Sequence, residues 1–127
     1  LYEAARLALS NGAVTEFLDG TPESHPERYA FACPSQQSVA SATQWVVHGT
    51  ADEDVPVELA TRHADLARET GQTVHLELLE GVGHYELIDP ISRAWPAVRH
   101  AIRTALGLPD LDSDPDLRGT VPGAGKQ

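Results

Sequence analysis

Two short segments of the chain carry side chains whose types suit proton-transfer chemistry. The first segment, residues 48–56 (HGTADEDVP), holds three carboxylates: Asp52, Glu53 and Asp54. The second, residues 80–85 (EGVGHY), holds His84 between a glycine-rich turn and a tyrosine. A carboxylate that hydrogen-bonds to an imidazole fixes the tautomer of the ring and stabilises the imidazolium that forms during acyl transfer. The residue types therefore indicate a base and its orienting acid, if the fold brings the two segments together.

Each segment directly follows a stretch with the pattern of a β-strand. Residues 43–47 (TQWVV) are β-branched and lack polar alternation, which is typical of a strand buried on both faces. Residues 73–79 (TVHLELL) alternate apolar and polar positions, which also indicates a strand. Between them, residues 56–70 place apolar side chains on one face of a helix that ends at Gly71. Strands joined by a crossover helix are normally parallel, so we expect the acid and the histidine at the same edge of one sheet.

Further helices are predicted on both sides of this unit, and the fold class is therefore α/β. A last helix follows Ser92, which we expect to cap it, and ends at Gly107. Residues 1–20 are predicted to be helical with a break at residues 10–12 (SNG), and a short helix is predicted over residues 26–31. We assign residues 1–107 to one domain. Residues 108–127 are rich in Asp, Pro and Gly, and we expect them to form a disordered tail.

Both segments resemble motifs of the α/β-hydrolase superfamily. Residues 48–56 are similar to the acid-bearing turn, His-Gly-x-x-Asp-x-x-Val-Pro, and residues 81–85 to the histidine turn, Gly-x-Gly-His followed by an aromatic residue. Their order agrees with the Ser…Asp…His order of this fold, and the esterase and prolyl-oligopeptidase-like branches are the most similar. The resemblance implies that residues 1–107 are the C-terminal strand–helix–strand–helix portion of an α/β-hydrolase parallel sheet.

The resemblance also assigns the catalytic roles. It implies that Asp52, three residues before Val55, is the triad acid and that His84 is the base. Asp54 and Glu53 remain alternative acids, and we expect Asp54 instead to cap the helix that follows, because an anion at a helix N-terminus is favourable. The implied activity is that of a serine hydrolase acting on a small-molecule ester or a peptide-like amide, without a cofactor or metal.

The nucleophile motif of the family is absent. None of the seven serines lies in a Gly-x-Ser-x-Gly pattern, and no Gly-rich oxyanion segment is present. Because the chain also lacks methionine, we expect that it is part of a longer hydrolase whose serine lies upstream, and that the chain alone is inactive. The alternative is a non-catalytic, truncated hydrolase remnant that serves as a binding or structural module.

The composition limits the possible partners. A formal net charge of −10 disfavours nucleic acid and anionic membrane surfaces, and no apolar run approaches the roughly 20 residues of a membrane span. The single cysteine, Cys33, excludes an intrachain disulfide and is expected to be a small, semi-buried apolar residue. No His-Glu-x-x-His or paired Cys-x-x-Cys motif indicates a metal site. The compartment stays open, with the cytoplasm favoured.

The remaining aromatic and histidine residues are interpreted structurally. We expect His48 to be a structural residue at the end of its strand, His63 to be packed on the apolar face of its helix, and Trp45 and Trp95 to lie in the core. The outer edge of the strand over residues 43–47 has no partner that we can identify in the sequence. We therefore expect this edge to pair with the missing N-terminal portion of the domain or to promote self-association.

Overall fold

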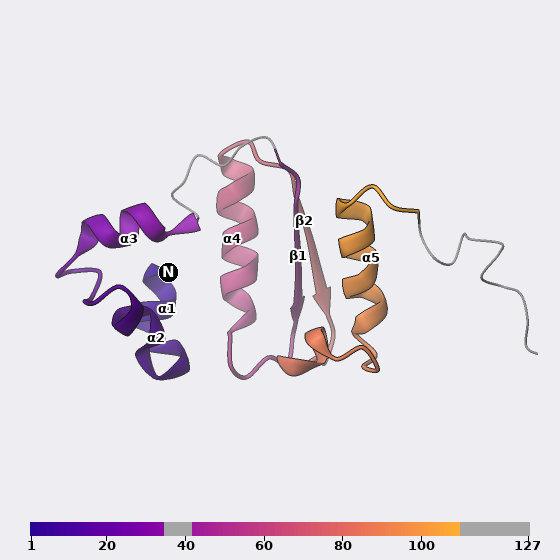
Figure 1. Ribbon diagram of the computed structural model, residues 1–127, viewed down its shortest axis with the longest axis horizontal. Coiled ribbons are helices and arrows are strands. Elements are labelled where there is room, and N and C mark those ends of the chain that lie inside the picture. Colours follow the sequence, from indigo (N-terminus) through magenta and orange to yellow (C-terminus); the bar gives the residue numbers. More distant parts are fainter. Residues whose placement is uncertain (35–41, 110–127) are drawn as a thin grey trace, which may run out of the picture.

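A two-stranded parallel sheet lies at the centre of the molecule. The computed structural model describes residues 1–34 and 42–109 (Figure 1). Strand β1 spans Gln44–Gly49 and β2 spans Val74–Leu79, and the two pair in parallel along their whole lengths. Both predicted strands and their parallel orientation are thus confirmed. Most of the predicted tail, residues 110–127, lies outside the described residues.

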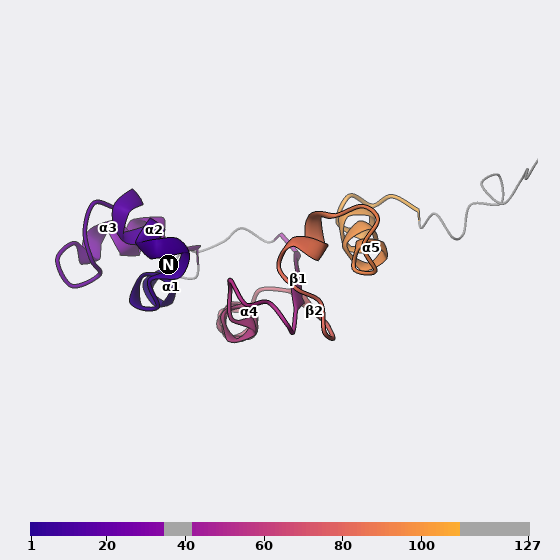
Figure 2. The same cartoon turned by 90° about the horizontal axis from the view of Figure 1, so that it is seen from below.

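One helix covers each face of the sheet (Figure 2). Helix α4 (Val57–Glu69) packs Ala64 and Ala67 against Val74, with Val46 and Leu76 beside them. On the other face, α5 (Trp95–Ala105) places Ala101 opposite Trp45 and Val47 of β1. A parallel sheet between helices belongs to the α/β class, as the sequence predicts.

The predicted burial of β1 and of the tryptophans is wrong. Residues 44–48 of β1 are only half-buried, because no strand within the described residues pairs with the outer edge of β1. Trp45 is half-buried and stacks on His75, with 4.2 Å between the ring centroids and 16° between the planes. Trp95, the first residue of α5, is also half-buried.

The predicted helix caps are also wrong. The residue before α4 is Pro56, and no side chain caps this helix, so Asp54 does not have the expected role. The backbone N–H groups of Asp54 and Val55 point instead to the carboxylate of Asp52. Helix α5 begins after Ala94, and Ser92 lies in the preceding turn, where its Oγ accepts a hydrogen bond from the Ala94 N–H at 3.2 Å.

The N-terminal segment forms three short helices beside α4 (Figure 1). Helix α1 spans Tyr2–Arg6, α2 spans Leu9–Phe17 and α3 spans Pro26–Ala32. The break predicted at residues 10–12 is confirmed, because all three residues have positive φ, up to 83° at Gly12. Helices α2 and α3 are joined through Tyr29, whose side chain is buried and whose hydroxyl donates to the Gly20 carbonyl at 2.9 Å.

Few direct contacts connect this segment to the sheet unit. Arg62 of α4 forms an ion pair with Glu3 of α1 at 3.8 Å.

Cys33, at the end of α3, is buried, with 2% of its surface exposed, and so is more buried than the sequence predicts. His63 is half-buried and its Nε2 lies 2.9 Å from Oε1 of Gln44, in agreement with the packed position expected for it. Within residues 1–34 and 42–109, no helix has the length and apolar character needed to cross a bilayer.

Candidate active site

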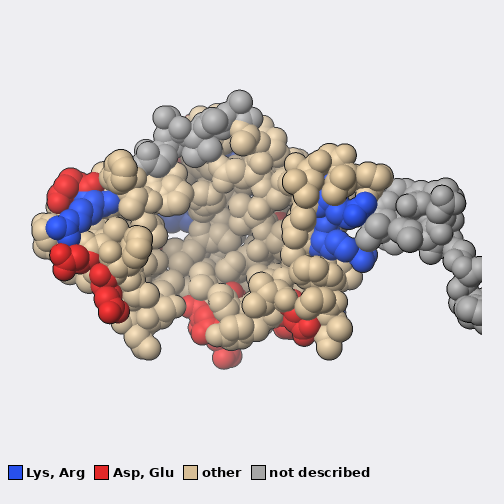
Figure 3. Space-filling view, in the orientation of Figure 1, with Lys and Arg blue, Asp and Glu red and all other residues tan. Residues whose placement is uncertain are grey.

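The loops that follow β1 and β2 are hydrogen-bonded to each other. The Thr50 N–H donates to the Leu79 carbonyl at 3.0 Å, and the Ala51 N–H donates to the Val82 carbonyl at 3.0 Å. In return, the Gly81 N–H donates to Oγ1 of Thr50 at 2.8 Å. Because parallel strands end at the same edge, these bonds extend the pairing of the sheet into the loops. Figure 3 shows acidic side chains along this edge of the molecule.

Two glycines permit this close approach. A Cβ atom on Gly49 would lie only 2.1 Å from the carbonyl oxygen of Val82, so a larger residue would push the loops apart. Gly81 has φ of +66°, a conformation that is costly for residues with a side chain. The glycines are therefore the local sequence features that let the acid loop and the histidine loop touch.

The carboxylate of Asp52 is buried and has three hydrogen-bond donors. Its side chain is 0% exposed. Oδ1 accepts from the N–H groups of Asp54 at 2.9 Å and Val55 at 2.8 Å, and Oδ2 accepts from Nδ1 of His84 at 2.9 Å. Burial alone raises the pKa of a carboxyl group, but the hydrogen bonds outweigh it and hold the pKa of Asp52 below its ordinary value. The residue is thus a buried carboxylate with a fixed orientation.

His84 presents the second half of the pair. Its side chain is 39% exposed, and its ring meets that of Tyr85 edge to face at 5.0 Å. The hydrogen bond to Asp52 raises the pKa of His84, partial burial opposes this rise, and the charges of Asp52 and Asp54 add to it. Among the described residues, no group hydrogen-bonds to the other ring nitrogen, Nε2. The predicted contact between Asp52 and His84 is confirmed.

The other two acids of the segment do not replace Asp52. Glu53 and Asp54 are exposed, and the only hydrogen bond given by Asp54 to this site comes from its backbone N–H. Ligand atoms of Asp52, Asp54 and His84 lie within 4.8 Å of one another, which is close enough to surround a metal ion. However, both oxygens of Asp52 already accept hydrogen bonds, one of them from His84 itself. The geometry therefore favours a hydrogen-bonded acid–base pair over a metal centre.

A short helical turn holds the His84 loop, and the sequence provides no prediction for the residues that build it. The turn η2 (Tyr85–Ile88) follows His84 directly. Glu86 accepts a hydrogen bond from the Gly83 N–H at 2.7 Å, and Arg93 donates to the Gly81 carbonyl. Glu86 also lies 3.6 Å from Arg93 as an ion pair. An acidic residue three positions after a glycine is only a weak sequence signal for such a turn, because the hydrogen bond between the two is seen only in the folded chain.

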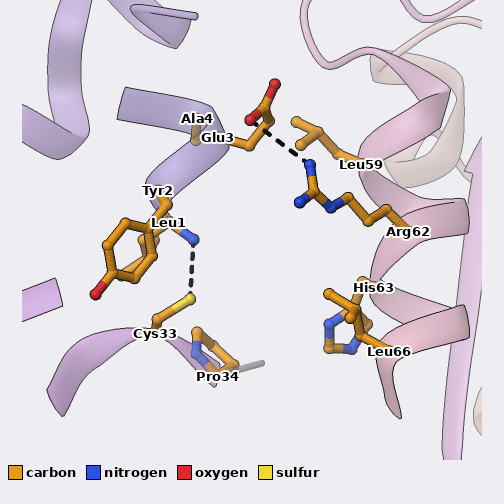
Figure 4. A pocket seen from close by; sticks show the side chains of 10 residues that line it. All are labelled: Leu1, Tyr2, Glu3, Ala4, Cys33, Pro34, Leu59, Arg62, His63 and Leu66. Carbon is orange, nitrogen blue, oxygen red and sulfur yellow. Dashed lines mark hydrogen bonds and ion pairs between the residues drawn. The ribbon is translucent and has the colours of Figure 1, made fainter. Parts of the chain in front are cut away.

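A cavity between α1, the end of α3 and α4 lies away from this pair (Figure 4). Its volume is about 570 Å³, and it separates α1 and the end of α3 from α4. None of the residues that line it belongs to the two loops: they are Leu1, Tyr2, Glu3, Ala4, Cys33, Pro34, Leu59, Arg62, His63 and Leu66. The cavity and the Asp52–His84 pair are therefore separate features of the molecule.

Comparisons of the chain with protein-family models, with curated proteins and with solved structures found no match.

Proposed function

We propose that Asp52 and His84 are the acid and the base of a serine-type hydrolase that cleaves an ester or a peptide-like amide bond. The observation that carries this proposal is the 2.9 Å contact between the fully buried carboxylate of Asp52 and Nδ1 of His84. A carboxylate can only accept, so Nδ1 carries the proton and the lone pair of the neutral ring lies on Nε2. Because the His84 side chain is 39% exposed, a free lone pair on Nε2 is suited to take a proton from a hydroxyl nucleophile.

Each residue has one role in the proposed reaction. His84 takes the proton of the attacking serine through Nε2 and then delivers it to the leaving group. Asp52 keeps the ring in this tautomer and stabilises the imidazolium that forms between the two steps. The raised pKa of His84 supports this role, because it makes the ring a stronger base. The substrate class, an ester or a peptide-like amide, rests on the resemblance to α/β-hydrolases.

The proposal assigns the nucleophile to polypeptide outside these 127 residues. The serines of the chain lie at positions 10, 24, 35, 38, 41, 92 and 113, and none is flanked by the glycines of a nucleophile turn. An acid and a base without a nucleophile or oxyanion donors leave most of the acyl-transfer barrier in place.

The test uses the natural gene product that contains this sequence and a fluorophosphonate probe, which reacts only with an activated serine. We expect the probe to modify a serine outside residues 1–127, as located by mass spectrometry of the digested protein. Asp52→Asn should lower turnover of p-nitrophenyl esters by about 10⁴-fold. His84→Ala, which removes the base itself, should lower it by about 10⁶-fold. The matched control, Asp54→Asn, alters a neighbouring exposed acid and should change turnover by no more than a few-fold.

Other outcomes would contradict the proposal in different ways. Modification of a serine within residues 1–127 would show that the nucleophile is in this chain. Equal losses in Asp54→Asn and Asp52→Asn would contradict the assignment of the acid. A natural product that neither reacts with the probe nor cleaves esters would favour the non-catalytic, hydrolase-like module.

A further inference from the structure

A second histidine lies next to the Asp52 carboxylate. His48 is the penultimate residue of β1, and the alternation of the strand places it on the same face as Val46, which packs on the α4 side of the sheet. Its side chain is only 13% exposed. The loop that leads from β1 into α4 starts at this point, so the ring of His48 lies beneath the turn that contains Asp52.

The ring of His48 bonds to this turn through one nitrogen. Nε2 lies 3.0 Å from the carbonyl oxygen of Val55 and 3.5 Å from Oδ2 of Asp52. A carbonyl oxygen can only accept, so Nε2 of His48 must carry the proton. The same oxygen of Asp52 accepts from His84, and therefore lies between two imidazole rings.

Val55 is hydrogen-bonded to both His48 and Asp52. Its N–H donates to Oδ1 of Asp52 at 2.8 Å, while its carbonyl accepts from His48. The peptide groups on both sides of Val55 are thus held, one by the carboxylate and one by the ring. If the ring lost its N–H, the Val55 carbonyl would be released, and the turn could rotate the carboxylate away from His84.

We propose that His48 is a positioning residue, whose Nε2–H holds the Val55 carbonyl and so fixes the turn that directs the Asp52 carboxylate at His84. This inference rests on the proposed function of the Asp52–His84 pair, because it concerns how that pair is oriented. His48 acts on the base through Asp52 and Val55, and it does not itself contact the reacting atoms.

The experiment compares two substitutions that separate the donor from the volume of the ring. His48→Gln places an amide N–H near the position of Nε2, whereas His48→Leu fills similar space without a donor. Both are measured by NMR in the natural gene product that contains this sequence, together with Asp52→Asn. The readouts are the exchange rate of the Val55 amide, the pKa of His84 from its ring protons, and the ¹⁵N shifts that report the tautomer of His48 in the unsubstituted chain.

We expect His48→Leu to raise the exchange rate of the Val55 amide by roughly tenfold, the effect of losing about one hydrogen bond from the turn. The pKa of His84 should fall part of the way towards its value in Asp52→Asn. His48→Gln should retain both properties of the unsubstituted chain. The amides of Ala64 and Ala67 in the core serve as the control, because their exchange should not change in either variant.

Several results would overturn the proposal. Unchanged Val55 exchange and an unchanged His84 pKa in His48→Leu would show that the ring does not position the acid. Equal losses in the Gln and Leu variants would show that the shape of the ring matters and its N–H does not. If His48→Leu does not fold, the ¹⁵N shifts of His48 in the unsubstituted chain provide the test. A His48 with an unprotonated Nε2 cannot donate to the Val55 carbonyl, and this result would overturn the proposal. If Asp52→Asn leaves the pKa of His84 unchanged, the proposed function itself fails.

Discussion

Removal of the Asp52 carboxylate tests whether this residue holds its turn together. The side chain accepts two backbone hydrogen bonds, from Asp54 and Val55, in addition to the one from His84. Asp52→Asn keeps a carbonyl oxygen that can accept both backbone bonds, whereas Asp52→Ala removes every acceptor. Neither variant has the carboxylate–imidazole contact, so the difference in stability between them is set by the two backbone bonds together with the packing of the amide group.

The structure gives the size of this difference. The Val55 N–H lies in a half-buried residue, and leaving such a group without a partner costs about 1–2 kcal/mol. The Asp54 N–H lies in an exposed residue and can bond to water instead, so it adds only about 0.5 kcal/mol. We expect Asp52→Ala to be less stable than Asp52→Asn by about 2 kcal/mol, with Asp54→Ala within about 0.5 kcal/mol of the unsubstituted chain.

Urea unfolding, followed by circular dichroism, measures these free energies, and equal m-values among the variants would show that the same structure unfolds. A gap between Asp52→Ala and Asp52→Asn below about 0.5 kcal/mol would refute the view that the carboxylate organises the turn. If Asp54→Ala were as destabilising as Asp52→Ala, the two acids would have to exchange roles.

Four further predictions follow from the same contacts and surfaces. The lowered pKa of Asp52 contributes stability above the ordinary carboxyl pKa, and this contribution is lost as the pH falls through the pKa of Asp52 in the folded chain. The raised pKa of His84 contributes stability below the ordinary histidine pKa, and this contribution is lost as the pH rises through the pKa of His84 in the folded chain. Thermal melts should therefore show the greatest contribution of this pair between about pH 4 and 6.5, and the loss on the alkaline side should be smaller in Asp52→Asn. Gly49→Ala should destabilise the chain by about 1–3 kcal/mol in urea unfolding, because its Cβ would meet the Val82 carbonyl at 2.1 Å, while Gly83→Ala, with 3.4 Å to a flexible Glu86 side chain, should cost less. Residues 1–127 alone should hydrolyse p-nitrophenyl esters no faster than a His84→Ala control, and robust turnover that depends on His84 would place the nucleophile within the chain. The isolated chain should self-associate in size-exclusion chromatography, because no described strand pairs with the outer edge of β1 and Phe17, Phe31 and Ile91 are 82%, 86% and 93% exposed. A compact monomer with a cooperative melt would contradict this.

Local patterns of residue types were enough to predict the type and order of the elements around the site. Alternation over residues 73–79 and the helical stripe over residues 56–70 are local patterns, and local patterns are what secondary structure reflects most directly. The left-handed break at residues 10–12 follows from Asn and Gly in the same way. The placement of the acidic segment and of His84 after successive parallel strands was also sufficient to predict that the two loops meet, because such strands end at one edge. The choice of Asp52 among the three acids came from the resemblance to α/β-hydrolases.

The way in which the acid is held and the extent to which the sheet is covered depend on tertiary contacts, which no local pattern predicts. Three carboxylates occupy the consecutive positions 52–54 after β1. Which of them is buried depends on the backbone N–H groups that the turn directs inward, and no local pattern predicts this. The half-burial of Trp45 likewise depends on whether another strand lies beside β1. The link from His48 through Val55 to Asp52 joins residues of a strand, a turn and a loop by hydrogen bonds of specific direction. Such bonds depend on the distances and angles between atoms in the folded chain, which residue type and spacing alone do not determine.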